Sequence, residues 1–140
     1  MVCSGIIIII CGIYLYNNTL AYNSGAHTAF DSEKEKDLVT NEYNYESGGY
    51  IIDSTNMSSK LFRLVKISLN VHVRSGKITF VVVDEKGNET KLVDVAEGES
   101  LREEYTVKDL GKEYYIKWIL EPQTKVSIQE KVAHYGYRRD

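Results

Sequence analysis

The stretch Val65-Lys66-Ile67-Ser68-Leu69-Asn70-Val71-His72-Val73 alternates strictly between apolar and polar residues. Because successive side chains of a strand point to opposite faces of a sheet, this pattern is typical of a half-buried β-strand. Just before the stretch, Phe62 and Leu64 have the opposite parity. We therefore expect a bend or a β-bulge at Arg63.

Further short strands follow at regular intervals, separated by turn residues such as Gly76 and Gly87. Residues 77–84 carry apolar side chains on both faces, which indicates a central strand. The sequence predicts strands at residues 50–53, 65–73, 77–84, 90–95, 103–107, 114–120 and 126–132. About seven strands at this spacing favour an all-β fold, an antiparallel β-sandwich of the jelly-roll or immunoglobulin-like type.

The composition is that of one ordinary globular domain. The chain has 140 residues, of which 43% are hydrophobic and 26% are charged, enough for a single hydrophobic core. Its 17 basic and 20 acidic residues leave a net charge of −3 at pH 7. This balance argues against binding to nucleic acid, which requires an excess of Lys and Arg.

No charged side chain precedes Asp31. The apolar run from Ile6 to Leu15 is short for a membrane-spanning helix but suits the core of a signal peptide. We expect residues 1–21 to be a leader cleaved after Ala21, so that the protein is secreted or lies at the cell surface. An anchor at residues 2–16 and a buried strand are the alternatives; the anchor would be the domain's only contact with a membrane.

Residues 22–48 are mainly polar and predict a linker, in which Ser32 and Glu35 could cap a short helix. The sandwich domain is expected at residues 49–140. Cys3 and Cys11 are the only cysteines. Because both precede the expected cleavage point, the mature chain would have neither a disulfide nor a thiolate site.

No motif for catalysis or for a cofactor is present. His27, His72 and His134 have no partner at the spacing of a metal motif, so we expect all three at the surface. The sequence contains neither a G-x-S-x-G motif nor a phosphate-binding loop. Its acidic residues match neither an EF-hand nor a defined glycosidase pair. We therefore expect no catalytic residue, no metal, no cofactor and no enzymatic activity.

The chain is rich in tyrosine, with 11 residues. Tyr114 and Trp118 have the parity of core residues. The tyrosines at other positions could contact a sugar ring or a protein partner through an apolar face and a polar tip. The candidate binding residues are Tyr115, Lys117, Tyr135 and Tyr137.

Residues 66–131 resemble small extracytoplasmic β-sandwich domains, including modules similar to the pre-peptidase C-terminal domain. The resemblance lies in the hairpin from Gly76 to Gly87 and in the strand with Gly111, Tyr114, Ile116 and Trp118. It implies an accessory or binding module without catalysis of its own. Some of these modules bind calcium through loop carboxylates, but no such set can be matched here.

These observations predict an exported, non-catalytic module that binds a cell-surface polysaccharide or protein. The alternative is a membrane-tethered structural or inhibitory protein with one specific protein partner. The sequence leaves the oligomeric state open.

Overall fold

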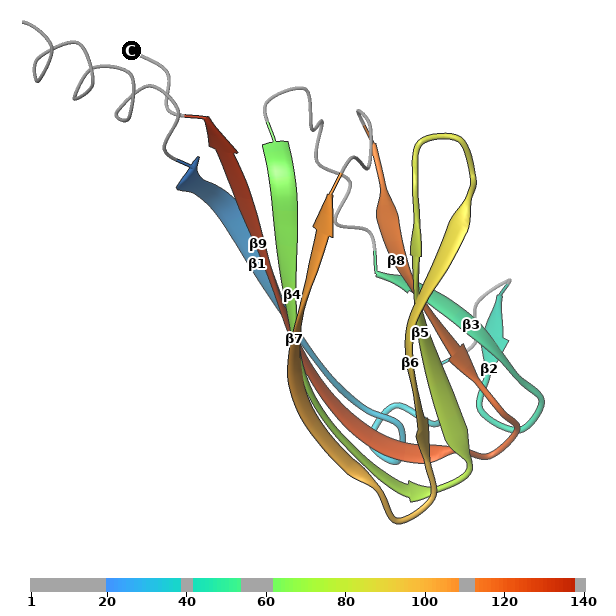
Figure 1. Ribbon diagram of the computed structural model, residues 1–140. Helices are drawn as coiled ribbons and strands as arrows, with labels where there is room; N and C mark the ends of the chain where they lie inside the picture. Colours follow the sequence, from blue (N-terminus) through green and yellow to red (C-terminus); the bar gives the residue numbers. More distant parts are fainter. Residues whose placement is uncertain (1–19, 39–41, 54–61, 109–112, 138–140) are drawn as a thin grey trace, which may run out of the picture.

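The computed structural model describes residues 20–38, 42–53, 62–108 and 113–137. These residues form nine strands: β1 (Leu20–Asp31), β2 (Tyr43–Asn44), β3 (Gly48–Asp53), β4 (Phe62–Ser75), β5 (Lys77–Val83), β6 (Glu89–Ala96), β7 (Ser100–Lys108), β8 (Tyr115–Leu120) and β9 (Lys125–Tyr137). They lie in two antiparallel sheets that form two layers (Figure 1). The expected all-β sandwich is confirmed, with β1 and β2 added to the seven expected strands.

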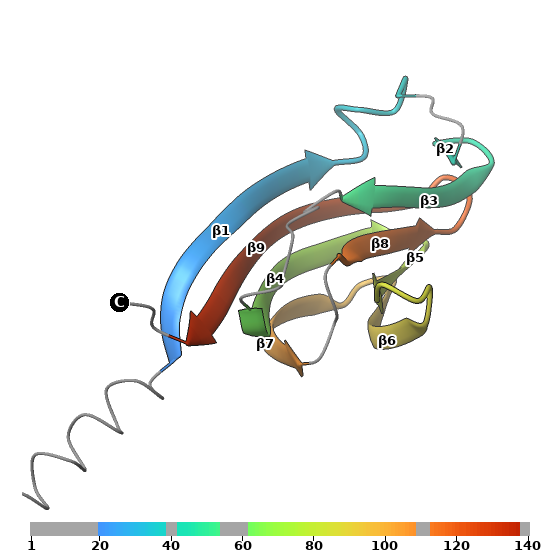
Figure 2. The same ribbon diagram turned by 90° about the horizontal axis from the view of Figure 1, so that it is seen from above.

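The four-stranded sheet has the order β1-β9-β4-β7, and the five-stranded sheet has the order β2-β3-β8-β5-β6. From β3 onward the chain crosses to the other sheet at every connection except that from β5 to β6. Of the two expected sandwich types, jelly roll and immunoglobulin-like, this strand order is that of a jelly roll. Figure 2 shows β1, β9 and β4 curving side by side in the four-stranded layer.

The alternating stretch that decides the fold lies in β4. Its apolar residues at positions 65, 67, 69, 71 and 73 are all buried. Each such burial contributes about 1.5–3 kcal/mol relative to an exposed side chain. The register between β4 and β9 shifts between Phe62 and Leu64, which confirms the expected bulge.

The core lies between the two sheets and has Trp118 of β8 near its centre. The Trp118 ring lies 5.6 Å from the ring of Phe30 and 6.2 Å from that of Phe80, edge-on in both pairs. This geometry is favourable for aromatic pairs. The β5 strand lies between β8 and β6, and residues on both of its faces are buried, as its sequence predicts.

The prediction of a polar linker at residues 22–48 is wrong for much of that range. Residues 20–31 form β1, an edge strand that pairs with β9 along its length. Among the β1 side chains that the structure describes, Phe30 is the only large apolar one buried in the core, so the alternation is too weak to recognise. The strand forms because β9 supplies the backbone hydrogen bonds. Residues 32–38 make turns rather than the short helix.

Residues 1–19, including Cys3 and Cys11, lie outside the described residues, and the predicted cleavage point after Ala21 falls within β1. In the described ranges, no helix is long and apolar enough to span a membrane. Cleavage, secretion and anchoring therefore stay predictions.

Candidate functional site

The outer face of the four-stranded sheet carries polar side chains in rows that cross all four strands. One row contains the cross-strand neighbours His27, Lys131, Ser68 and Glu104. The adjacent row contains Ala29, Gln129, Asn70 and Arg102. Directly opposed residues of neighbouring strands lie close enough for one ligand to contact several of them.

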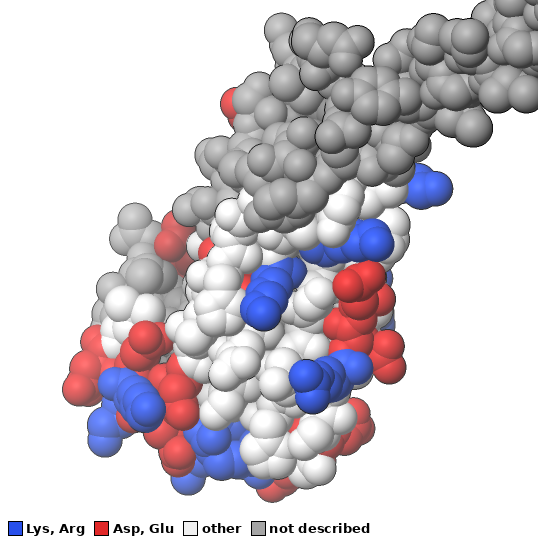
Figure 3. Space-filling model, turned by 90° about the vertical axis from the view of Figure 1, so that its left-hand side faces the viewer, with Lys and Arg blue, Asp and Glu red and all other residues white. Residues whose placement is uncertain are grey.

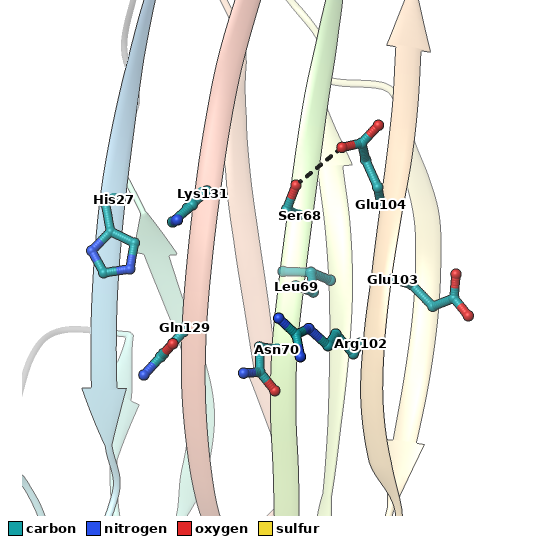
Figure 4. A pocket seen from close by; sticks show the side chains of 9 residues that line it. All are labelled: His27, Ser68, Leu69, Asn70, Arg102, Glu103, Glu104, Gln129 and Lys131. Atoms are coloured by element: carbon teal, nitrogen blue, oxygen red, sulfur yellow. Dashed lines mark hydrogen bonds between the residues drawn. The ribbon is translucent and has the colours of Figure 1, made fainter.

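The two rows surround an open hollow of about 410 Å³. It is lined by His27, Ser68, Leu69, Asn70, Arg102, Glu103, Glu104, Gln129 and Lys131. In Figure 4, Arg102 extends across β4 beside Asn70, whereas Glu103 points away beyond the edge of β7. On the other side of His27 and Lys131, a second depression continues over Gly25 and Ala133, whose side chains are small.

Most polar side chains of this hollow have no partner among the residues that the structure describes. Glu104 is engaged, because the Ser68 hydroxyl donates to its Oε2 at 3.4 Å and the Lys66 ammonium lies 3.9 Å from its Oε1. Across the described ranges, the side chains of Asn70, Gln129, Arg102 and Lys131 make no hydrogen bond or ion pair with other described residues. We call this set of four the polar cluster. Its hydrogen-bonding groups are available to a ligand.

The predicted binding residues whose side chains the structure describes lie on opposite faces of the sandwich. Tyr115 and Lys117 point outward from the five-stranded sheet, and Tyr135 points outward from the four-stranded sheet. Tyr137 ends β9, and its side chain is outside the described set. The structure therefore does not bring the predicted residues together in one site.

Lys117 belongs to a small apolar surface. Its Nζ lies 4.4 Å from the centre of the Tyr50 ring and 3.0 Å from Oε1 of Glu89. Beside it, Ile52 and Ile119 are 42% and 37% exposed. We call Tyr50, Ile52 and Ile119 the apolar patch.

Tyr135 lies on the same face as the polar cluster. It is four residues from Lys131 along β9, which corresponds to roughly 14 Å in a strand. The ring is half-buried, and the Lys66 ammonium lies 5.2 Å from its centre. Tyr135 therefore extends the polar face with an aromatic surface.

A carboxyl group is buried between the two sheets, directly behind the polar cluster. Nε1 of Trp118 donates a hydrogen bond to Oε2 of Glu130 at 2.9 Å. Burial raises the pKa of Glu130 to about 9; Asp53 adds to this rise, and the bond from Trp118 opposes it. Glu130 is therefore protonated at neutral pH. Asp53 is held in turn by the Thr28 hydroxyl, which donates to both carboxylate oxygens at 3.3 Å.

His134 is fully buried, which corrects the prediction that all three histidines lie at the surface. Its Nε2 shares a hydrogen bond with the Tyr114 hydroxyl. The cause is parity, because His134 continues the inward-facing series of Val126, Ile128 and Val132 beyond the predicted end of the strand. The other two histidines are exposed, His27 on β1 and His72 on β4.

The polar cluster and the burial of Glu130 are not among the features predicted from the sequence. Asn70 was visible as an outward-facing residue of β4, but its neighbours on β7 and β9 depend on the register between strands. Glu130 has the parity of Ile128 and Val132, and that parity was the signal for its burial. No group of three His, Cys, Asp or Glu side chains suited to a metal ion is found in the part of the chain that the structure describes.

Comparison with known proteins supports the fold. No family model matches the chain, and no curated protein matches it. A chain from the Bacillus endospore appendages, which form disulfide-linked pili, has a TM-score of 0.53 at 11% identity, covering 87% of this chain and 94% of that one. A family 29 carbohydrate-binding module has a TM-score of 0.39 at 14% identity, covering 81% and 90% of the two chains.

A third structure, TmCBM61 in complex with β-1,4-galactotriose, has a TM-score of 0.40 at 12% identity, covering 91% of this chain and 93% of that chain. The match to the endospore-appendage chain, at 11% identity, shows a shared fold and nothing finer. The resemblance to pre-peptidase C-terminal modules stays a prediction.

Proposed function

We propose that this protein is a non-catalytic binding module that holds a cell-surface polysaccharide on the outer face of its four-stranded sheet. The observation that carries the proposal is the polar cluster. Four side chains from three adjacent strands line one open hollow, and none of them is engaged by another described residue.

The chemistry of the cluster suits a sugar. Asn70 and Gln129 each offer both a carbonyl acceptor and an amide donor, so they can match hydroxyl groups, which also donate and accept. Arg102 and Lys131 add donors only. An extended chain lying along β9 from Gln129 would reach Tyr135 after roughly 20 Å, and the Tyr135 ring would offer an apolar surface to a sugar ring.

A binding role without catalysis agrees with the position of the buried acid. Glu130 is 1% exposed and forms a hydrogen bond with Trp118 inside the core, so a polymer on the outer face does not reach it. The outward-facing acid of the hollow, Glu104, is engaged by Lys66 and Ser68. An export signal in residues 1–21 would bring the module to such a polymer.

The test is retention of the full chain on a panel of immobilised neutral and acidic polysaccharides. We expect retention on at least one polymer, and we expect Asn70→Ala with Gln129→Ala to abolish it. Both residues are exposed, so the unfolding midpoint should not move. Ile119→Ser is the matched control on the opposite face. No retention of the wild-type chain on any polymer would overturn the proposal.

A second candidate function is binding of a protein partner through the apolar patch. Ile52 and Ile119 lie on neighbouring strands and are among the few large apolar side chains that are exposed within the described ranges. Exposed apolar surface of this kind is common at protein interfaces. If Ile52→Ser and Ile119→Ser abolish capture of a partner while the Asn70 and Gln129 substitutions do not, this second function is favoured.

A further inference from the structure

We infer that the polysaccharide bound at this face is acidic, carrying carboxylate or sulfate groups. This inference rests on the proposed function and names the ligand class of the same hollow. It follows from the charges at the hollow, which differ from those of the chain as a whole.

The hollow holds two cations without a counter-ion. The chain has a net charge of −3, yet neither Arg102 nor Lys131 forms an ion pair with a described residue. Two other cations of the same face are compensated: Lys66 lies 3.9 Å from Glu104, and Arg74 lies 3.2 Å from Asp31 and 3.0 Å from Glu33. Figure 3 shows this face, with basic side chains over its middle and acidic side chains towards its margins.

The acidic side chains that line the hollow do not neutralise these two cations. Glu104 is drawn toward Lys66 and Ser68, and Glu103 points away from the hollow (Figure 4). An anion entering the hollow therefore meets Arg102 and Lys131 without first displacing a carboxylate. Charge-assisted hydrogen bonds to such an anion are about twice as strong as neutral ones.

The placement of the two cations favours a polymer over a single anion. Arg102 and Lys131 start from β7 and β9, which are separated by β4, and they lie in adjacent rows. Their backbones are therefore roughly 12 Å apart. Each cation can bind a different acidic group of one chain, so that the second contact forms at high effective concentration. Asn70 and Gln129 lie between them and can bind the intervening hydroxyl groups.

The hollow fits a glycan better than a nucleic acid. None of its lining residues is Phe, Tyr or Trp, whereas single-stranded nucleic acids are bound by a basic groove together with large aromatic side chains on which the bases stack. Tight binding to a phosphate backbone requires many Lys and Arg contacts. The hollow offers only two unpaired cations, and the chain as a whole has a negative net charge.

The experiment measures the affinity of the full chain for polygalacturonate, dextran sulfate and uncharged dextran fragments of matched length, with a single-stranded DNA as a fourth probe. We expect at least one acidic polysaccharide to bind tenfold or more tightly than dextran, and its binding to weaken as salt is added. Arg102→Gln and Lys131→Gln should each weaken it roughly tenfold, the value of one charge-assisted contact. Glu104→Gln should strengthen it, because a carboxylate is removed.

Lys86→Gln is the matched control, since it removes one positive charge from the β5–β6 turn on the other sheet. If dextran binds as tightly as the acidic polymers, the ligand is neutral and only this inference fails. If no polysaccharide binds, the proposed function fails with it. If DNA binds as tightly as the acidic glycans and the same substitutions remove that binding, the face is an unspecific anion binder and the inference is overturned.

Discussion

The buried carboxyl of Glu130 should make the stability of this protein decrease as pH rises. The folded protein retains the Glu130 proton up to a pKa of about 9, whereas an ordinary glutamate, with a pKa of 4.5, has lost it at neutral pH. Between these values the unfolded chain binds fewer protons than the folded one. The free energy of unfolding therefore falls by up to about 1.4 kcal/mol per pH unit, or up to about 4 kcal/mol from pH 5 to pH 8.

The substitution Glu130→Gln should remove this dependence. A glutamine carbonyl can still accept the hydrogen bond from Trp118, but it has no proton to lose. We expect the variant to be about as stable as the wild type at pH 5 and more stable at pH 8, by up to about 4 kcal/mol. Urea unfolding at both pH values measures this, with the fluorescence of Trp118, the only tryptophan, as the probe.

Two aspartates with lowered pKa values are separated from Glu130 by pH, and an exposed glutamate serves as a control for the substitution. The backbone N–H of Asn88 holds the pKa of Asp84 below its ordinary value, and the Thr79 hydroxyl does the same for Asp94. Their contributions are present above pH 4 and are lost only in acid. Glu104→Gln, the same chemical change at an exposed site, should leave the slope unchanged. The difference between wild type and the Gln variant isolates Glu130 from the buried His134, so a Gln variant that keeps the full slope of the wild type would refute the reasoning.

Two further predictions concern turns and the outer surface. Gly76 and Gly87 have almost the same positive φ, 82° and 83°, but a Cβ at Gly76 would lie 2.9 Å from Cα of Thr124, whereas one at Gly87 would meet nothing within 4 Å. Gly87→Ala should therefore cost about 1 kcal/mol and Gly76→Ala about 3 kcal/mol or more in urea unfolding, and equal costs would contradict this account. Tyr115→Ala should cost about 1–2 kcal/mol, because Tyr115 is half-buried opposite the buried Val83; an unchanged urea midpoint would contradict this packing.

The strands with strong alternation could be predicted from the sequence, and those held mainly by neighbours could not. The residues of β4 alternate without exception, and even the bulge at its start was visible as a change of parity at Phe62 and Leu64. In β1, small and polar side chains such as Gly25, His27 and Thr28 conceal the alternation. That segment is a strand because β9 offers it a free edge, and this is a property of the fold rather than of local sequence.

The candidate site depends on register, which no single segment encodes. Asn70 could be placed on an outward face, but its alignment with Arg102 and Gln129 joins residues that are 32 and 59 positions away in the chain. The tyrosines predicted as binding residues therefore rest on residue type alone, because the sequence does not show which side chains lie beside them. The structure separates Tyr115 from Tyr135 because β8 and β9 belong to different sheets.

The buried and the exposed residues of β9 are linked through this same register. Glu130 lies between Gln129 and Lys131 in the chain, so the strand that presents two residues of the polar cluster outward also points an acid into the core. A slip of β9 by one residue would move Gln129 and Lys131 into the interior and Glu130 to the surface. Trp118 on the facing sheet offers Glu130 a hydrogen-bond donor at 2.9 Å, and a slip that brought Lys131 to this position would leave that donor without an acceptor at a cost of about 1–3 kcal/mol. The buried acid lowers stability at neutral pH, but its bond to Trp118 favours the one register in which the polar cluster is assembled.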